Sequence, residues 1–195
     1  MEKEFEKTVV EHWNSKNELE QTIAAGVHGA PELKPDEKSA FLGEFKERVL
    51  RAMTKEQVAE NAVYVEIVQA LQDKRAARLI FSGDIDHHYT DKYVQFARKF
   101  GKPYVIRHDQ KYKSNIGLLV AANQAVDAAQ VMVESRAERL AGLGLPLAVI
   151  KAAGGKVCGE CYALIEKTAP EELINYERLS FFDRLTGEKC PAHPG

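Results

Sequence analysis

Two short apolar segments in the middle of the chain predict buried strands. The first, residues 79–81, reads Leu-Ile-Phe and is closed by Ser82 and Gly83. The second, residues 104–107, reads Tyr-Val-Ile-Arg. Short runs of this kind, bounded by turn residues, are typical of strands inside a sheet.

The segment between them has the pattern of a helix over residues 91–100. Thr90 is a good N-cap. Gly101 favours the left-handed conformation that ends a helix, and Pro103 prevents its continuation. One face of this helix carries the apolar side chains Tyr93, Phe96, Ala97 and Phe100. A strand, a helix and a strand with short links form a right-handed unit, so we expect the two strands to be parallel neighbours.

Two more apolar segments extend the predicted sheet. Residues 116–122 predict a third strand, and residues 131–133 predict a fourth. Residues 109–116 are too few to hold a crossover helix, so we expect the third strand to run antiparallel. The fold class is therefore α/β, with a mixed sheet, flanking helices and one parallel βαβ unit.

Helical periodicity dominates the part of the chain before these strands. An apolar residue recurs every fourth position, at Phe41, Phe45, Val49 and Met53. This spacing predicts a helix with one buried stripe. Thr54 and Gln57 have capping-box spacing, which predicts a new helical turn at Thr54. Residues 62–71 predict another helix.

The two ends of the chain differ in character from its centre. Residues 1–17 are consistent with a short amphipathic helix or with a frayed terminus, and a loop marked by Gly and Pro covers residues 26–35. Pro146 and Gly154 bracket a helix over residues 147–153. We divide the chain into an N-terminal extension (1–18), an α/β domain (19–135) and a small helical tail (136–195).

Composition and charge exclude several classes of protein. The net charge of −2 gives no global field that favours nucleic acid or a membrane surface. The longest apolar run, residues 117–122, is far shorter than the roughly 20 residues of a membrane span. Residues 1–18 carry charges of both signs, unlike a secretory signal. We therefore expect a cytoplasmic protein without a membrane segment.

The tail contains a pattern of cysteine and histidine residues that is typical of a metal site. Cys158 and Cys161 are separated by two residues, and so are Cys190 and His193, with 28 residues between the pairs. A two-residue spacer lets both side chains of a pair face one ion, and Cys₃His is a ligand set of structural Zn²⁺. All three cysteines of the chain belong to this pattern. The sequence predicts one structural zinc ion in the tail.

Two other interpretations of the cysteines remain open. Cys158 lies near the expected start of a helix, where the pKa of a thiol is lowered, so Cys158 and Cys161 could form a redox pair. Alternatively, the three cysteines are reduced and partly buried. The tail has few large apolar residues for an independent core, and a unit of this size usually needs a metal, a disulfide or a docking surface.

Polar side chains follow both predicted parallel strands at the edge of the sheet where ligands commonly bind in α/β proteins. The candidates are Asp84, Asp86, His87, His88 and His108. Carboxylates and imidazoles at this edge could hold a metal or transfer protons. The alternative is a polar loop whose residues were selected for turn propensity and solubility.

Basic residues precede the same two strands and form a candidate basic patch at the opposite edge. They are Lys74, Arg75, Arg78, Arg98, Lys99 and Lys102. Such a cluster could attract RNA or an acidic protein. Cations at the ends of helices explain it equally well, because they interact favourably with the helix dipole.

Several segments resemble the YueI-like family, a bacterial domain family of unknown function. They are residues 31–37 (Pro-Glu-Leu-Lys-Pro-Asp-Glu), 41–43 (Phe-Leu-Gly), 47–49 (Glu-Arg-Val), 53–58 (Met-Thr-Lys-Glu-Gln-Val), 80–84 (Ile-Phe-Ser-Gly-Asp) and 117–122 (Gly-Leu-Leu-Val-Ala-Ala). The resemblance covers about residues 19–134. It implies a compact α/β fold related to bacterial chorismate mutase and to the ribosomal proteins that bind kink-turn RNA, and it offers no established catalytic residues to transfer to this chain.

Two hypotheses of function follow. The first is a non-enzymatic binding or regulatory module whose partner is RNA or a protein. The second is an enzyme that uses the Asp/His edge. We favour the first, because no set of residues has the spacing of a known reaction.

Overall fold

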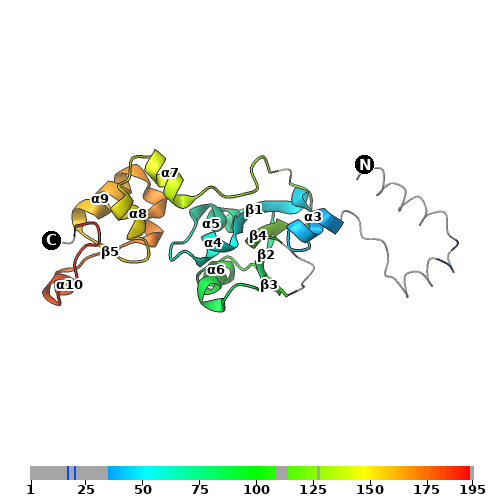
Figure 1. Ribbon diagram of the computed structural model, residues 1–195, viewed down its shortest axis with the longest axis horizontal. Helices are drawn as coiled ribbons and strands as arrows, with labels where there is room; N and C mark the ends of the chain where they lie inside the picture. The colour runs from blue at the N-terminus through cyan, green and yellow to red at the C-terminus, as the bar shows by residue number, and fades with distance from the viewer. Residues whose placement is uncertain (1–16, 18–19, 21–34, 109–113, 127, 194–195) are drawn as a thin grey trace.

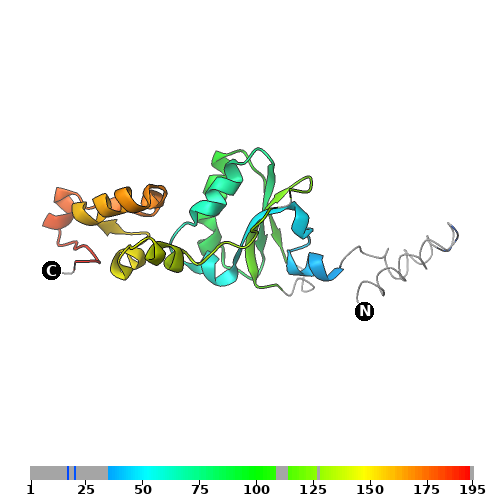
Figure 2. The same ribbon diagram turned by 90° about the horizontal axis from the view of Figure 1, so that it is seen from above.

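The computed structural model describes residues 17, 20, 35–108, 114–126 and 128–193 (Figure 1). Except for their last residues, the expected N-terminal helix over residues 1–17 and the loop over residues 26–35 lie outside this part of the chain. The described residues form an α/β domain and a C-terminal unit, which lie beside each other along the long axis of the molecule (Figures 1 and 2).

The α/β domain contains a four-stranded mixed sheet with the order β1-β4-β2-β3. The strands are β1 (Val49–Thr54), β2 (Ala76–Ser82), β3 (Tyr104–Arg107) and β4 (Ile116–Ala122). β2 and β3 are parallel neighbours, with Leu79 opposite Tyr104. β4 lies between β1 and β2 and is antiparallel to both. The predicted α/β class, the parallel pair and the antiparallel third strand are confirmed.

The crossover between β2 and β3 is α6 (His87–Lys99), which begins one turn earlier than its sequence predicts. The N-cap is Asp86, whose carboxylate accepts a hydrogen bond from the His88 backbone N–H at 2.9 Å. Thr90 lies inside the helix, where its hydroxyl donates to the His87 carbonyl at 3.0 Å. The predicted cap at Thr90 is therefore wrong, because Asp86 offers a stronger acceptor one turn earlier. The end of the helix is as predicted, with Gly101 at a φ of +64°.

Residues 41–53 do not form the predicted helix. α3 (Pro35–Ala40) ends in a turn at Leu42 and Gly43, both with positive φ, and η1 (Lys46–Arg48) leads into β1. Val49, Leu50, Ala52 and Met53 are all buried, because β1 is covered on both faces. A strand buried on both faces has no alternation of polar and apolar residues, so a four-residue repeat can arise within it by coincidence.

The predicted fourth strand at residues 131–133 is a single bridge from Met132 to Ala52. The Ala52 N–H donates to the Val131 carbonyl at 2.8 Å, and the Val133 N–H donates to the Ala52 carbonyl at 2.9 Å. This segment pairs with the outer side of β1, so the fourth strand of the sheet is β1 and not residues 131–133.

Helices cover one face of the sheet. They are α4 (Lys55–Ala59), α5 (Val65–Gln72) and α6, and their side chains Val58, Ile67 and Tyr93 share one core with Leu79 and Leu118. The predicted capping box of α4 is confirmed at Thr54 and Gln57. The opposite face packs Val49, Ile80 and Leu119 against Leu42 and Val131.

The C-terminal unit has a core of its own. Its elements are α7 (Arg136–Gly142), α8 (Leu147–Lys151), β5 (Lys156–Val157), α9 (Gly159–Thr168), η2 (Pro170–Asn175), β6 (Glu177–Arg178) and α10 (Phe181–Leu185). β5 and β6 form a small parallel ladder that the sequence did not predict. Leu140, Val149, Val157, Ile165 and Cys161 are buried together. Over the described residues, no helix is long and apolar enough to cross a membrane.

Candidate metal centre

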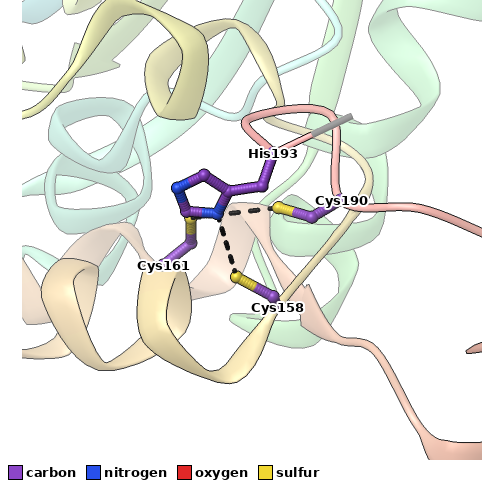
Figure 3. Close-up of side chains that lie close together, drawn as sticks. All are labelled: Cys158, Cys161, Cys190 and His193. Atoms are coloured by element: carbon purple, nitrogen blue, oxygen red, sulfur yellow. Dashed lines mark hydrogen bonds between the residues drawn. The ribbon is translucent and has the colours of Figure 1, made fainter. Parts of the chain in front are cut away.

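Cys158, Cys161, Cys190 and His193 converge in the C-terminal unit (Figure 3). Their potential ligand atoms all lie within 4.8 Å of one another. His193 Nδ1 is 3.4 Å from Cys158 Sγ and 3.5 Å from Cys161 Sγ. Cys161 Sγ and Cys190 Sγ are 3.9 Å apart. The structure therefore brings together all four residues that the spacing selected.

These distances match the edges of a tetrahedral zinc site. With Zn–S bonds of about 2.3 Å and a Zn–N bond of about 2.0 Å, two sulfurs of a tetrahedron lie about 3.8 Å apart, and a sulfur and a nitrogen about 3.5 Å apart. The three distances agree with these values to about 0.1 Å. The whole group spans up to 4.8 Å, about 1 Å more than such an edge, so its donor atoms suit a Cys₃His zinc site once the group contracts around the ion.

Local backbone structure explains how each pair is positioned. Cys158 is the N-cap of α9, and Cys161 lies in the first turn of that helix, so both sulfurs face the same side. β5 leads directly into Cys158, and the Leu179 N–H fixes β5 by donating to the Val157 carbonyl at 2.9 Å. The second pair comes from a tight turn in which the His193 N–H donates to the Cys190 carbonyl at 2.9 Å. The Pro191 ring restricts the backbone inside this turn.

Two ligands are buried and two are accessible. Cys161 and Cys190 are 2% and 5% exposed and belong to the core of the unit. Cys158 is half-buried, and the His193 side chain is exposed. An ion at this position would connect the core of the C-terminal unit to the last turn of the chain.

The Cys158 and Cys161 thiols affect each other's ionisation. Burial raises the pKa of Cys158, but hydrogen bonds with the Cys161 backbone N–H and with His193 outweigh it, so that the pKa is about 6. Burial raises the pKa of Cys161, and the neighbouring thiols Cys158 and Cys190 act in the same direction, so that the pKa is about 12. Thiolates this close repel one another, so all three are ionised together only around a cation.

The Asp/His edge does not form a similar group. Among the residues that the structure describes, the Cys₃His cluster is the only set of three or more potential ligands that converges. Asp84 pairs with Lys55 at 2.6 Å, and Asp86 caps α6. His88 stacks edge-on against Tyr89, and His108 lies against Gly83. The pKa of Asp84 is lowered, chiefly by Lys55 and slightly by the nearby His108, but no three of the five residues converge on one point.

Neighbouring acidic side chains neutralise part of the basic patch. The alignment of β2 with β3 places all six cations at the same end of the sheet. Arg75 pairs with Asp73 at 2.7 Å, and Arg78 pairs with the buried Glu44 at 2.9 Å. The Lys102 ammonium donates to the Ala76 carbonyl at 2.5 Å. Lys74, Arg98 and Lys99 remain exposed. An RNA or acidic protein partner at this patch stays a prediction.

A buried polar network was missed by the sequence analysis. Arg136, 3% exposed, pairs with the fully buried Glu172 at 2.7 Å, and it also donates to the Tyr176 hydroxyl at 2.8 Å. Asn175 bonds the backbone of Val63, accepting from its N–H at 2.6 Å and donating to its carbonyl at 2.8 Å. The bonds between Asn175 and Val63 attach the C-terminal unit to the α/β domain, whereas the Arg136 side chain bonds residues of its own unit. No spacing rule could have revealed them, because the partners are up to 112 residues apart.

Burial alone would lower the pKa of Arg136, but Glu172 and Tyr176 raise it above its usual value. The guanidinium is therefore charged inside the protein. A buried charge of this kind depends on its partners, because an unpaired ion in the interior is very costly.

Fold and site together define a small α/β domain with an appended Cys₃His unit. The model of a protein family of unknown function, DUF1694, matches residues 16–132. The chain belongs to this family, the YueI-like family, as its sequence segments predict.

Comparison with known proteins places the resemblance in the α/β domain. The chain is 30% identical over 120 residues to the uncharacterised protein YueI of Bacillus subtilis (strain 168). This alignment covers 62% of this chain and 91% of YueI. The crystal structure of YueI matches with a TM-score of 0.51 at 29% identity, over 62% of this chain and 94% of that chain. All four residues of the Cys₃His cluster lie beyond residue 132, outside the match to the family model.

Proposed function

We propose that this protein is a non-enzymatic binding module whose C-terminal unit is held together by one structural zinc ion. The observation that carries the proposal is the convergence of three sulfurs and one imidazole nitrogen within 4.8 Å. Four protein ligands close the coordination sphere of Zn²⁺ and leave no position for a substrate or a reactive water. The ion would therefore stabilise the fold and would take no part in a reaction.

The need for a structural ion follows from the weak apolar core of the last 40 residues. Of the large apolar side chains after residue 155, Val157, Ile165, Tyr176 and Leu179 are buried. Several others are exposed: Leu164, Ile174, Phe181, Phe182 and Leu185. A segment that buries so few apolar groups gains little from the hydrophobic effect, and a metal supplies the missing stabilisation.

A binding role is supported over catalysis by the arrangement of the Asp/His edge. Asp84 is held by Lys55 and Asp86 by the start of α6, so these carboxylates have structural partners. A general acid or base has to lie within hydrogen-bonding reach of a common substrate atom. The separate contacts of Asp84 and Asp86 favour a supporting role for this edge.

Elemental analysis tests the zinc proposal. Protein purified without added metal is expected to contain close to one zinc per chain. His193→Gln should reduce the zinc content, because the amide is a poor zinc ligand. His87→Gln is the matched control, since His87 is an exposed histidine outside the cluster, and its zinc content should equal that of the wild type.

The same preparation distinguishes the redox alternative. A metal-free wild type whose Cys158 and Cys161 cycle between thiol and disulfide would replace the zinc site by a redox pair. A metal-free wild type with three stable thiols would leave only reduced, partly buried cysteines. Either result would contradict the proposal.

A further inference from the structure

β3 is an edge strand with an accessible side. In the sheet formed by the described residues, β3 is last in the order and has β2 as its only neighbour. The Leu79 N–H donates to the Pro103 carbonyl at 3.0 Å, and the Gly83 N–H donates to the Arg107 carbonyl at 2.7 Å. In a parallel ladder this pattern turns the odd-numbered residues of β3 toward β2. The backbone N–H and C=O groups of Tyr104 and Ile106 therefore point to the free side.

One edge of the sheet, at β1, is covered by another segment of the chain, whereas the other edge, at β3, has no such cover among the described residues. The outer side of β1 is covered by the segment around Met132, which bonds to Ala52. β3 reads Tyr-Val-Ile-Arg and contains no proline, lysine or bulge between its ends. These are the devices by which proteins prevent an edge strand from pairing with another strand. β3 has only four residues and ends in the charged Arg107, but Tyr104, Val105 and Ile106 carry none of these devices and leave the free side open to a second strand.

A cavity of about 340 Å³ lies beside this edge, between β3 and α6. Its apolar floor is formed by Phe81, Val94 and Ile106. Asp91, Gln95 and Arg98 form its rim on α6, and all three are exposed. Their spacing of four and three residues places them on one face of the helix.

The sign of the charge changes from one end of this rim to the other. The Arg98 guanidinium lies 6.0 Å from the centre of the Tyr104 ring, at the start of β3. Because α6 runs opposite to β3, Asp91 lies toward the other end of the strand. The rim is positive near Tyr104, neutral at Gln95 and negative toward Ile106. A two-fold rotation about an axis near Gln95 and Val105 would place Arg98 of one copy opposite Asp91 of another.

We propose that this face binds a second copy of the same chain through antiparallel pairing of the two β3 strands. Tyr104 of one copy lies opposite Ile106 of the other, and the two residues exchange backbone hydrogen bonds. Their side chains form an aromatic and β-branched cross-strand pair, which is a favourable combination. The Asp91 and Arg98 side chains of the two α6 helices form two symmetric ion pairs. Such a contact is isologous, and it closes as a dimer.

Charge exchange on α6 tests the proposal. Wild type is expected to sediment as a dimer at micromolar concentration. In Arg98→Asp, the new aspartate of each copy lies opposite Asp91 of the other, and in Asp91→Arg two arginines oppose each other in the same way. Each single variant should weaken self-association roughly 100-fold, because like charges across an interface cost several kcal/mol. The double variant Asp91→Arg with Arg98→Asp restores both pairs and should dimerise like the wild type. Lys167→Asp is the control, because it makes the same change of charge as Arg98→Asp at an exposed position of α9.

Hydrogen exchange separates strand pairing from contact through the helices alone. The amides of Tyr104 and Ile106 should exchange slowly in the wild type and rapidly in Arg98→Asp, with unchanged circular dichroism in both. A monomeric wild type would overturn the proposal, and so would single variants that dimerise normally. A double variant that stays monomeric while folded would contradict the two-fold arrangement, and rapid exchange of both amides in the dimer would exclude pairing through β3.

Discussion

Cys161→Ser is expected to lose the zinc ion and to unfold the end of the C-terminal unit while the α/β domain stays folded. Cys161 is the most buried of the four ligands, and its sulfur lies close to both Cys190 and His193. A structural zinc site contributes directly to folding, because the site does not exist in the unfolded chain. The α/β domain keeps its own core, so its stability should change little.

Limited proteolysis followed by mass spectrometry measures this effect. Cleavage after residue 153 should become more than about tenfold faster in Cys161→Ser, since protection from protease follows the free energy of local opening. Cleavage within residues 49–122 should keep its wild-type rate. His88→Gln serves as a control, because His88 is an exposed histidine at the start of α6, away from the cluster. A Cys161→Ser protein that keeps its zinc and resists protease would show that Cys161 is not a ligand.

Arg136→Met is expected to destabilise the C-terminal unit by about 3–5 kcal/mol, the usual cost of removing one partner of a buried ion pair. Glu172 is fully buried, and Arg136 is the more deeply buried of its two arginine partners. Arg136 also donates to the Tyr176 hydroxyl and to the Ile150 carbonyl at 3.1 Å. The substitution leaves these acceptors with fewer donors, and it leaves the Glu172 carboxylate with less positive charge nearby.

The matched double variant identifies the cause of this loss. Arg136→Met combined with Glu172→Leu removes both charges, so it should be more stable than Arg136→Met alone. Urea unfolding monitored by hydrogen exchange in α9 and η2 gives the free energy of each protein. A double variant that loses as much stability as the sum of the two single variants would mean that the charges do not interact.

The sequence was most informative where local rules and long-range contacts agree. The strand at residues 79–81, the end of α6 at Gly101 and the strand at residues 104–107 were predicted, because apolar runs and turn residues mark them directly. The convergence of the Cys₃His group could also be predicted, since a two-residue spacer constrains each pair and the chain has no other cysteine.

Other elements depend on contacts that no local pattern contains. β1 was mistaken for a helix because a strand buried on both faces lacks the alternation that identifies strands. Phe181, Phe182 and Leu185 are about three-quarters exposed, and nothing in their local sequence pattern distinguishes them from buried apolar residues. The bond from Asn175 to Val63 joins two units of the chain, and polar residues of this kind give no signal of burial in a sequence.

X-ray absorption spectroscopy at the zinc edge tests the central claim most directly, because it counts the ligand atoms around the ion in the purified protein. The account predicts one tetrahedral zinc per chain with three sulfur neighbours at about 2.3 Å and one nitrogen neighbour at about 2.0 Å. His193→Cys should convert this pattern to four sulfur neighbours. A wild-type protein without zinc, or zinc surrounded by oxygen and nitrogen alone, would contradict the account.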